Sequence, residues 1–351
     1  MHIQFHGSIA GNMSGTSAKA RSGCNGKAGL TLAAFTCVAA VTFGSAGVQA
    51  QSFPERPVQI SVGQQAGGAL DTIARSLATG LSQIWGQTVT ILNRPGAAAI
   101  VSVQETTRAK PDGYTLVFAT EGALTRSQFL VANLGYDPIK DLEPVSSMAV
   151  VPMVMVVNPD LMKAKDVSSF IAEVKKAPNK LSYASAGIGG SHHVLMARLE
   201  VAAGIQMTQV PYKGGAPALT DVMGGHLPVM FSGIATALPF IKSGRLVPLG
   251  FVGPQRSPFI PTVPTFHEQG FLSGVTGDWI AIMAPKGTPA DITRKIATDI
   301  ATVSKSETFQ TRLLGAGYEI SLTEGKDLAD LIVKTSAQNK EIFRAAGIGV
   351  Q

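Results

Sequence analysis

Two adjacent glycines, Gly67 and Gly68, stand where a strand pattern changes into a helix pattern. Apolar residues alternate over 58–62, as in a strand, and from Leu70 onward they recur at helical spacing. Glycine lets the backbone come close to a bound molecule, and the first N–H groups of a helix are free to receive an anion. This loop therefore predicts a contact to a small anionic ligand.

A second loop of the same kind follows a strand predicted over 181–185. In it, Gly187 and Gly190 precede a helix predicted over 191–203. Each helix N-terminus stabilises a nearby anion by roughly 0.3–1 kcal/mol, and by more when the anion is partly buried. Two such loops facing each other predict a cleft for one small anion.

The chain after residue 50 alternates strand and helix patterns, which predicts an α/β fold with mainly parallel sheets. We expect strands at 58–62, 88–92, 114–119, 151–157, 181–185, 207–211, 227–231, 246–252 and 278–284. We expect helices at 68–85, 97–109, 125–132, 166–176, 191–203, 215–223, 235–242, 289–304, 307–315 and 324–345.

Two apolar stretches, 150–157 and 276–285, are predicted to carry the chain between two domains. One domain is expected from residues 51–152 plus 277–351, and a second, inserted domain from residues 153–276. Each domain would form one lobe with its own sheet flanked by helices. Ligands in such folds bind at the carboxyl ends of the strands, so we expect the ligand cleft between the lobes.

The first fifty residues have the pattern of a secretory signal peptide. Basic residues precede an uncharged run over 28–44, and small residues at Val48-Gln49-Ala50 offer a cleavage site near Ala50. A membrane anchor is the alternative, but the apolar run is shorter than the roughly 20 residues that a spanning helix needs. We therefore expect cleavage and a mature chain in the periplasm.

The positions of the cysteines and the net charge exclude several kinds of site and partner. Both cysteines, Cys24 and Cys37, fall in the leader, so the mature chain would have no disulfide, thiol catalysis or cysteine–metal site. Of the 29 lysines and arginines three lie in the leader, which leaves 26 against 23 acidic residues. Because this small excess comes without a basic run, we expect no nucleic-acid partner.

Short motifs in a fixed order along the mature chain carry a family resemblance. They include Ala66-Gly-Gly-Ala-Leu-Asp-Thr-Ile-Ala-Arg75, Lys110-Pro-Asp-Gly-Tyr-Thr-Leu116, Val210-Pro-Tyr-Lys-Gly-Gly-Ala-Pro-Ala-Leu-Thr-Asp221 and the segments 53–57, 93–97, 136–141, 156–159, 181–187, 237–244, 256–258, 263–265 and 284–289. Any one motif is weak evidence, but their order and spacing are specific. Together they resemble the Bug-type extracytoplasmic solute receptors, the substrate-binding components of tripartite tricarboxylate transporters.

The resemblance implies a two-lobed receptor, not an enzyme, that closes on one carboxylate and delivers it to membrane permease subunits. No cofactor or metal is implied, and we expect a monomer. In similar receptors one loop of each domain grips a carboxylate through backbone groups and ordered water. Carried onto this chain, the ligand-binding residues of the first loop are Gln64, Gln65, Ala66, Gly67, Gly68 and Asp71, and those of the second are Ser185, Ala186, Gly187, Gly190, Ser191 and His193.

Departures from the family pattern are expected to set ligand specificity. Gln64 and Gln65 replace the Phe-Pro or Ala-Pro of many relatives, and their amides are able to donate to carboxylate oxygens or trap water. The alternative is a solvated loop. Ser232 stands where many relatives carry an aspartate, and without that acid an amino-acid ligand is disfavoured.

Arg126 follows the third predicted strand, where relatives usually carry uncharged residues. A guanidinium there is suited to a two-pronged hydrogen bond with a second carboxylate, which favours a dicarboxylate ligand. The alternatives are that Arg126 pairs with Glu121 or points into solvent. An aromatic carboxylate is a further possibility if Trp279 and Phe129 stack on the ligand, although such residues are usually core.

His192 and His193 do not predict a metal site, because adjacent histidines on a helix point in different directions and no third ligand lies at a useful spacing. His193 matches a histidine common in the family and is expected to serve cleft polarity or packing. Asp71 is expected mainly to stabilise its helix start, with ligand contact secondary.

Two other functions stay open. A periplasmic hydrolase would need a motif such as Gly-x-Ser-x-Gly, which Gly189-Gly190-Ser191-His192-His193 resembles only superficially. The chain also has no H-E-x-x-H motif and no P-loop. The other possibility is a receptor that passes its closed form to a signalling partner, for which the receptor sequence would look the same.

Overall fold

The computed structural model describes residues 53–95, 99–177, 179–275 and 277–349. The predicted leader, residues 1–50, and its cleavage site near Ala50 lie outside this part of the chain. Among the described residues, no helix combines the length and the apolar character needed to cross a membrane.

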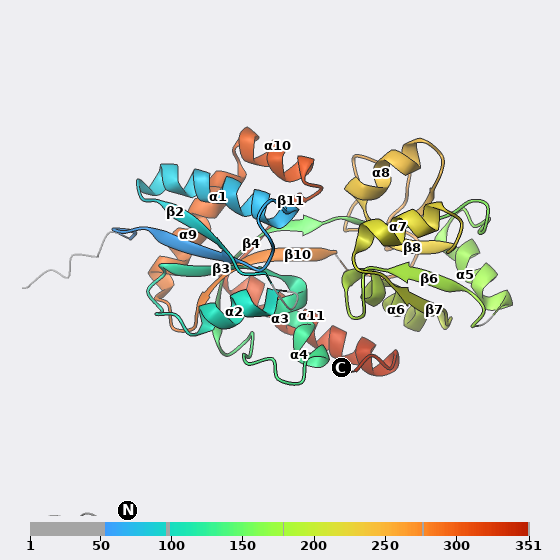
Figure 1. The fold of residues 1–351 in the computed structure, drawn as a ribbon, viewed down its shortest axis with the longest axis horizontal. Helices are drawn as coiled ribbons and strands as arrows, with labels where there is room; N and C mark the ends of the chain where they lie inside the picture. Colours follow the sequence, from blue (N-terminus) through green and yellow to red (C-terminus); the bar gives the residue numbers. More distant parts are fainter. Residues whose placement is uncertain (1–52, 96–98, 178, 276, 350–351) are drawn as a thin grey trace, which may run out of the picture. The chain divides into compact units, whose positions relative to one another are not determined.

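The first sheet has six strands, seen with their helices in Figure 1. From edge to edge they are β11 (Glu319–Glu324), β4 (Leu142–Val151), β10 (Asp278–Pro285), β3 (Thr115–Thr120), β1 (Val58–Val62) and β2 (Val89–Asn93). β1 pairs in parallel with β2 and β3. β10 runs antiparallel to β3 and β4, and β11 runs antiparallel to β4.

The second sheet has five strands. In order they are β7 (Thr208–Pro211), β6 (Ser182–Ser185), β8 (Val229–Gly233), β5 (Met153–Val157) and β9 (Val247–Val252). β6 is parallel to β7 and β8, whereas β5 is antiparallel to β8 and β9.

The predicted α/β class is confirmed, and most strands of each sheet run in one direction, with β10 and β11 in the first sheet and β5 in the second running against the others. Both sheets therefore also contain antiparallel pairs. Most of these pairs arise at β5 and β10, each of which is the first strand that the chain forms after it passes from one sheet to the other. Ile280, near the start of β10, pairs with Thr120 at the end of β3, and Met153 at the start of β5 pairs with Gly233 at the end of β8. A strand that begins where its neighbour ends must run against it.

Helices cover both faces of each sheet (Figure 1). On the first sheet, α1 (Ala69–Trp85), α9 (Ala290–Ser304) and α10 (Glu307–Gly315) share one apolar cluster, and α2 (Ile100–Thr107), α3 (Glu121–Thr125) and α11 (Gly325–Ala345) share the other. On the second sheet, α5 (Val167–Lys176) and α6 (Ser191–Ala203) pack on one face, and α7 (Gly215–Met223) and α8 (Ile234–Lys242) on the opposite face. A short helix, α4 (Ser127–Leu130), follows α3.

Burial on both faces explains why β5 reads as an unbroken apolar run. Met153, Met155 and Val157 belong to one core cluster of the second sheet, whereas Val154 and Val156 belong to the other. Successive side chains of a strand point to opposite faces, so both sets must be apolar.

Several predicted elements match the structure residue for residue, namely the strand 58–62 and the helices 191–203, 215–223 and 307–315. The predicted helix 125–132 is instead the pair α3 and α4, and the strands β4 and β11 were not predicted. Strands of the first sheet come from 58–151 and 278–324, and those of the second from 153–252. The domain boundaries at 152/153 and 276/277 stay a prediction.

Candidate functional site

The first glycine-rich loop connects β1 to α1, as predicted from the change of pattern. Gly67 adopts a left-handed backbone with φ of 84°, which glycine reaches without steric cost, and Gly68 is the N-cap of α1. Gln64, Gln65, Ala66 and Gly67 are all exposed. The predicted residues of this loop therefore lie at the start of a helix and are accessible to solvent.

The structure corrects the expectation that the N–H groups of this helix start are all free. Gly67 N–H donates to Asp71 Oδ2 (2.9 Å), and Gly68 N–H donates to the carbonyl of Gln65 (3.3 Å). Leu70 N–H donates to Gln64 Oε1 (3.2 Å), so a side-chain amide oxygen occupies the place of an anion oxygen. Of the backbone N–H groups of residues 67–70, that of Ala69 has no acceptor in the described residues.

The second loop connects β6 to α6 and has more free donors. Gly190 is the N-cap of α6 and has no side-chain hydrogen bond to cap it. In the described part of the chain, the N–H groups of Gly190, Ser191 and His192 have no acceptor. A helix start with several free N–H groups is suited to receive an anion.

The two loops are held by equivalent contacts. Asp71 and His193 both stand three residues after the N-cap glycine of their helix, and each accepts from the glycine just before that N-cap. Asp71 accepts from Gly67, and His193 Nδ1 accepts from Gly189 N–H (3.0 Å). Asp71 thus stabilises the loop before its helix, close to the role predicted for it.

The ionisation of these two side chains follows from their surroundings. Burial acts to raise the pKa of Asp71, but hydrogen bonds from Arg75, Gly67 and Asn93 outweigh it and hold the pKa below its usual value. Burial lowers the pKa of His193 to about 4, so the ring is neutral at physiological pH. Since Nδ1 accepts a hydrogen bond, the ring proton is on Nε2.

Gln209, on the edge strand β7, holds the rest of the second loop and was missed by sequence reasoning. Its Nε2 donates to Ser185 Oγ (2.7 Å) and to the carbonyl of Gly187 (3.3 Å). Ser185 is fully buried, and Ala186 and Gly187 are partly exposed. These contacts fix Ser185 as a support of the loop.

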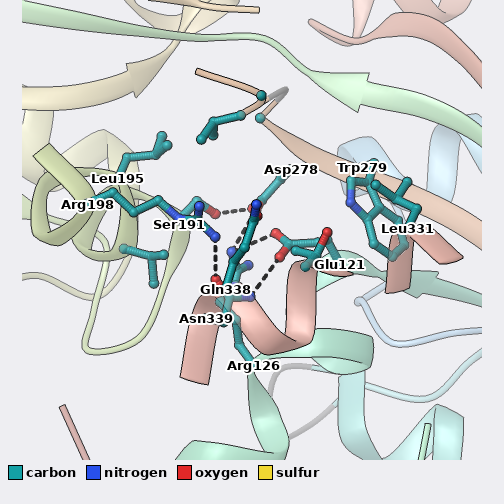
Figure 2. Close-up of a pocket in the computed structure, with 15 residues that line it drawn as sticks. Glu121, Arg126, Ser191, Leu195, Arg198, Asp278, Trp279, Leu331, Gln338 and Asn339 are labelled. Atoms are coloured by element: carbon teal, nitrogen blue, oxygen red, sulfur yellow. Dashed lines mark hydrogen bonds and ion pairs between the residues drawn. The ribbon is translucent and has the colours of Figure 1, made fainter. Parts of the chain in front are cut away.

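Arg126 lies between α3 and α4, with 7 % of its surface exposed. Its Nη1 contacts Glu121 Oε2 at 2.7 Å and Asp278 Oδ1 at 2.9 Å. The alternative interpretation, pairing with Glu121, is therefore what the structure shows. Figure 2 shows this cluster, in which Ser191 also donates to the carboxylate of Asp278.

The buried charges shift each other's pKa values. Burial raises the pKa of Glu121 to about 7, and the nearby Asp278 adds to the rise against the pull of Arg126. Burial also acts to raise the pKa of Asp278, but Arg126 outweighs it and holds that pKa well below the usual range. Burial acts to lower the pKa of Arg126, but the two carboxylates outweigh it and keep the guanidinium charged.

Arg126, Ser191 and Asp278 line one cavity of about 70 Å³. This volume has room for several water molecules. Of the predicted site residues, the structure brings Arg126 and Ser191 together here (Figure 2). Within the described residues no hydrogen bond or ion pair joins the first loop to the second, so the predicted pincer stays a prediction.

The remaining predicted residues lie elsewhere. Ser232 is buried near the end of β8, where its hydroxyl donates to the neighbouring carbonyl of Gly233 (3.3 Å). Trp279 is buried in the core of the first sheet and lines the cavity, and Phe129 packs edge-on against Phe343. Within the described part, no group of three His, Cys, Asp or Glu side chains is arranged to hold a metal ion.

Sequence reasoning missed Asp278 and Asn339 as members of the Arg126 cluster. Asn339 Nδ2 donates to Glu121 Oε1 (3.3 Å) and to Thr125 Oγ1 (3.0 Å). One signal was available, since Asp278 is an acidic residue directly before the apolar run 279–284. A charge at the start of a buried strand requires a partner.

Known proteins resemble this chain over most of its length. Residues 73–348 match the tripartite tricarboxylate transporter family receptor. Protein BugT of Bordetella pertussis is 35 % identical over 249 residues, which is 71 % of this chain and 76 % of BugT. A solved structure of the periplasmic binding protein BugD is 31 % identical, with a TM-score of 0.67 over 85 % of this chain and 100 % of that chain.

A second solved structure contains a ligand. Rpa4515 of R. palustris with adipate is 28 % identical, with a TM-score of 0.70 over 85 % of this chain and 100 % of that chain. Both solved structures share the fold of this chain, and BugD is a periplasmic binding protein. The chain belongs to the tripartite tricarboxylate transporter receptor family, as a Bug-type solute-binding protein.

Proposed function

We propose that the chain is a periplasmic receptor that captures a small carboxylate between its two glycine-rich loops by lobe closure. It then delivers the ligand, as a monomer, to the permease subunits of a tripartite tricarboxylate-type transporter. The observation that carries this proposal is the start of α6, where the N–H groups of Gly190, Ser191 and His192 have no acceptor in the described residues. A carboxylate supplies the negative charge and the acceptors that such a helix start favours.

The first loop is able to bind the ligand if a ligand carboxylate replaces the Gln64 side-chain oxygen as the acceptor at the start of α1. Gln64 Oε1 accepts from Leu70 N–H, and Gln64 is exposed. A ligand carboxylate that replaced this amide oxygen would gain the N–H groups of Ala69 and Leu70 and release the Gln64 side chain. The freed amide would then donate to the ligand or to a bridging water.

A dicarboxylate is the favoured ligand class. Rpa4515, a solved relative, holds adipate, which has two carboxylates. Arg126 is already paired with Glu121 and Asp278, so a second carboxylate would reach it only by displacing one of them. We therefore assign the contacts with the ligand to the two loops, and Arg126 acts through its ion pairs with Glu121 and Asp278.

A thermal-shift screen of residues 51–351 tests this function. The screen would compare acetate, butyrate and benzoate with succinate, malate, adipate and phthalate. A ligand at a hundred times its dissociation constant stabilises the folded state by about 2.7 kcal/mol, which is a rise of several degrees in Tm. We expect the largest rise with a dicarboxylate, and recovery of that ligand unchanged after denaturation. Absence of a shift with every carboxylate, or turnover of a carboxylate ester, would contradict the proposal.

A further inference from the structure

Two side-chain hydrogen bonds tie α6 to elements of the first sheet. Ser191 donates to Asp278 at the start of β10, and Arg198 Nη2 donates to Asn339 Oδ1 on α11 (2.8 Å). Within the described residues, no other side-chain hydrogen bond joins α6 to an element of the first sheet. Figure 2 shows both reaching the same cluster of side chains.

Both acceptors bond to groups around Glu121. Asp278 shares the guanidinium of Arg126 with Glu121, and Asn339 donates to Glu121 itself. Glu121 is 5 % exposed, and the hydroxyl of Thr125 also donates to its carboxylate (2.6 Å). The position of α6 therefore depends on one buried network centred on Glu121 and Arg126.

We propose that Glu121, Arg126, Asp278 and Asn339 are positioning residues that hold α6, and with it the second loop, and that one proton on Glu121 controls this hold. The proposal rests on the proposed function in one respect, that the second loop is an arm of the ligand site. It goes further in predicting that ligand affinity depends on pH through a residue that does not touch the ligand.

The charges around Glu121 set the direction of this effect. Arg126 and Asp278 face it directly, and α6 contributes Arg198 and His192, whose pKa burial lowers. Tyr318, just before β11, faces Asp278, and α11 contributes the neutral side chains Thr335, Gln338 and Asn339. A protonated Glu121 is able to donate to Asp278, whereas an ionised Glu121 repels it and competes with it for Arg126.

The hold on α6 is therefore strongest when Glu121 is protonated. Burial raises the pKa of Glu121 to about 7 while the network is intact. If α6 moves away, water reaches the carboxyl and its pKa falls toward the usual value, so ionisation favours the released position. The hold is accordingly present below about pH 7 and weakens as the pH rises through that value.

Trp279 offers a readout that needs no ligand. It lines the same cavity as Glu121 and Asp278, and Trp85 is the second of the two tryptophans in the chain. In a Trp85→Phe background, we expect the fluorescence of Trp279 to change with a midpoint near pH 7. Glu121→Gln, which keeps the shape of the protonated side chain and does not ionise, should abolish this transition.

The matched control is Glu105→Gln, which removes an exposed carboxylate paired with Arg94 and should leave the transition in place. A flat fluorescence profile, or one that Glu121→Gln leaves unchanged, would overturn the proposal. Neither result depends on which ligand the protein binds.

Succinate titrations at pH 6.5 and 8 test the link to the ligand site. We expect tighter binding at pH 6.5 than at pH 8, by about fourfold, because a carboxyl that titrates near pH 7 in the held position is mostly protonated at the lower pH and ionised at the higher. Glu121→Gln should bind succinate equally at the two pH values, apart from the small change that succinate's own titration causes. Ser191→Ala removes one of the two hydrogen bonds that tie α6 to this network, so it should keep the fluorescence transition and reduce the dependence of affinity on pH.

Equal succinate affinity at both pH values in the unmodified chain would contradict the coupling. If succinate does not bind at either pH, the proposed function fails for this ligand. The hold on α6 is then judged by the fluorescence of Trp279 alone.

Discussion

Replacing Arg126 with leucine is expected to lower the free energy of unfolding by about 3–5 kcal/mol at pH 7.5, measured by urea denaturation. The substitution leaves the buried Glu121 and the partly buried Asp278 without the cation that contacts them at 2.7 and 2.9 Å. A buried charge that has lost its partner keeps its desolvation penalty and loses the compensating attraction. Arg126 thus stabilises the fold, in addition to any contact with a ligand.

The effect of pH checks this reasoning. Without the guanidinium the pKa values of both carboxyls rise, so the folded variant takes up protons that the unfolded chain does not bind. The stability deficit should therefore shrink as the pH falls from 7.5 to 5. Arg94→Leu removes an arginine from an exposed ion pair and should cost less than about 1 kcal/mol. A variant Arg126→Leu as stable as the unmodified chain, with only ligand binding lost, would show that Arg126 is a ligand anchor instead.

Replacing Asp71 with alanine is expected to lower the free energy of unfolding by about 2–3 kcal/mol and to weaken carboxylate binding about tenfold. The Asp71 carboxylate is buried and accepts from Gly67 N–H, Arg75 Nε and Asn93 Nδ2 at 2.8–2.9 Å. Without it the loop before α1 loses its main anchor, and its N–H groups no longer converge on one position. Urea denaturation and calorimetric titration with succinate measure the two effects.

Asp299→Ala provides the matched control. Asp299, on α9, is also largely buried and accepts from Trp85 Nε1 (2.6 Å) and Lys295 Nζ (2.9 Å). Among the described residues no hydrogen bond or ion pair joins Asp299 to either glycine-rich loop, so the variant should lose stability and keep its affinity. If Asp71→Ala bound succinate as tightly as the unmodified chain does, the first loop would not belong to the ligand site.

Most of the fold could be predicted from the sequence because its elements are strongly periodic and clearly bounded. The helix at 166–176 is an example, since Asp166 forms the capping box with Ser169 and the helix ends before Pro178. β4 was missed because Pro144 and the buried serines 146 and 147 interrupt its apolar pattern. β11 was missed because it is an edge strand whose apolar residues, Ile320 and Leu322, are exposed.

The candidate site was predicted where local pattern determines it. Both glycine-rich loops and the role of Asp71 follow from residues within one strand–loop–helix unit. The network around Arg126 was not predictable in this way, because Asp278 lies 152 residues along the chain from Arg126, and Asn339 lies 218 residues from Glu121. Gln209 was missed for the same reason, since its contacts to the second loop depend on how β7 pairs with β6.

The most direct test of the central claim is calorimetric titration of residues 51–351 with succinate and, separately, with dimethyl succinate. The two molecules share a carbon skeleton, but the ester carries no charge and presents no carboxylate oxygens to the helix starts. Capture by backbone N–H groups predicts saturable binding of succinate and none of the ester. Equal binding of both, or binding of the ester alone, would contradict the account.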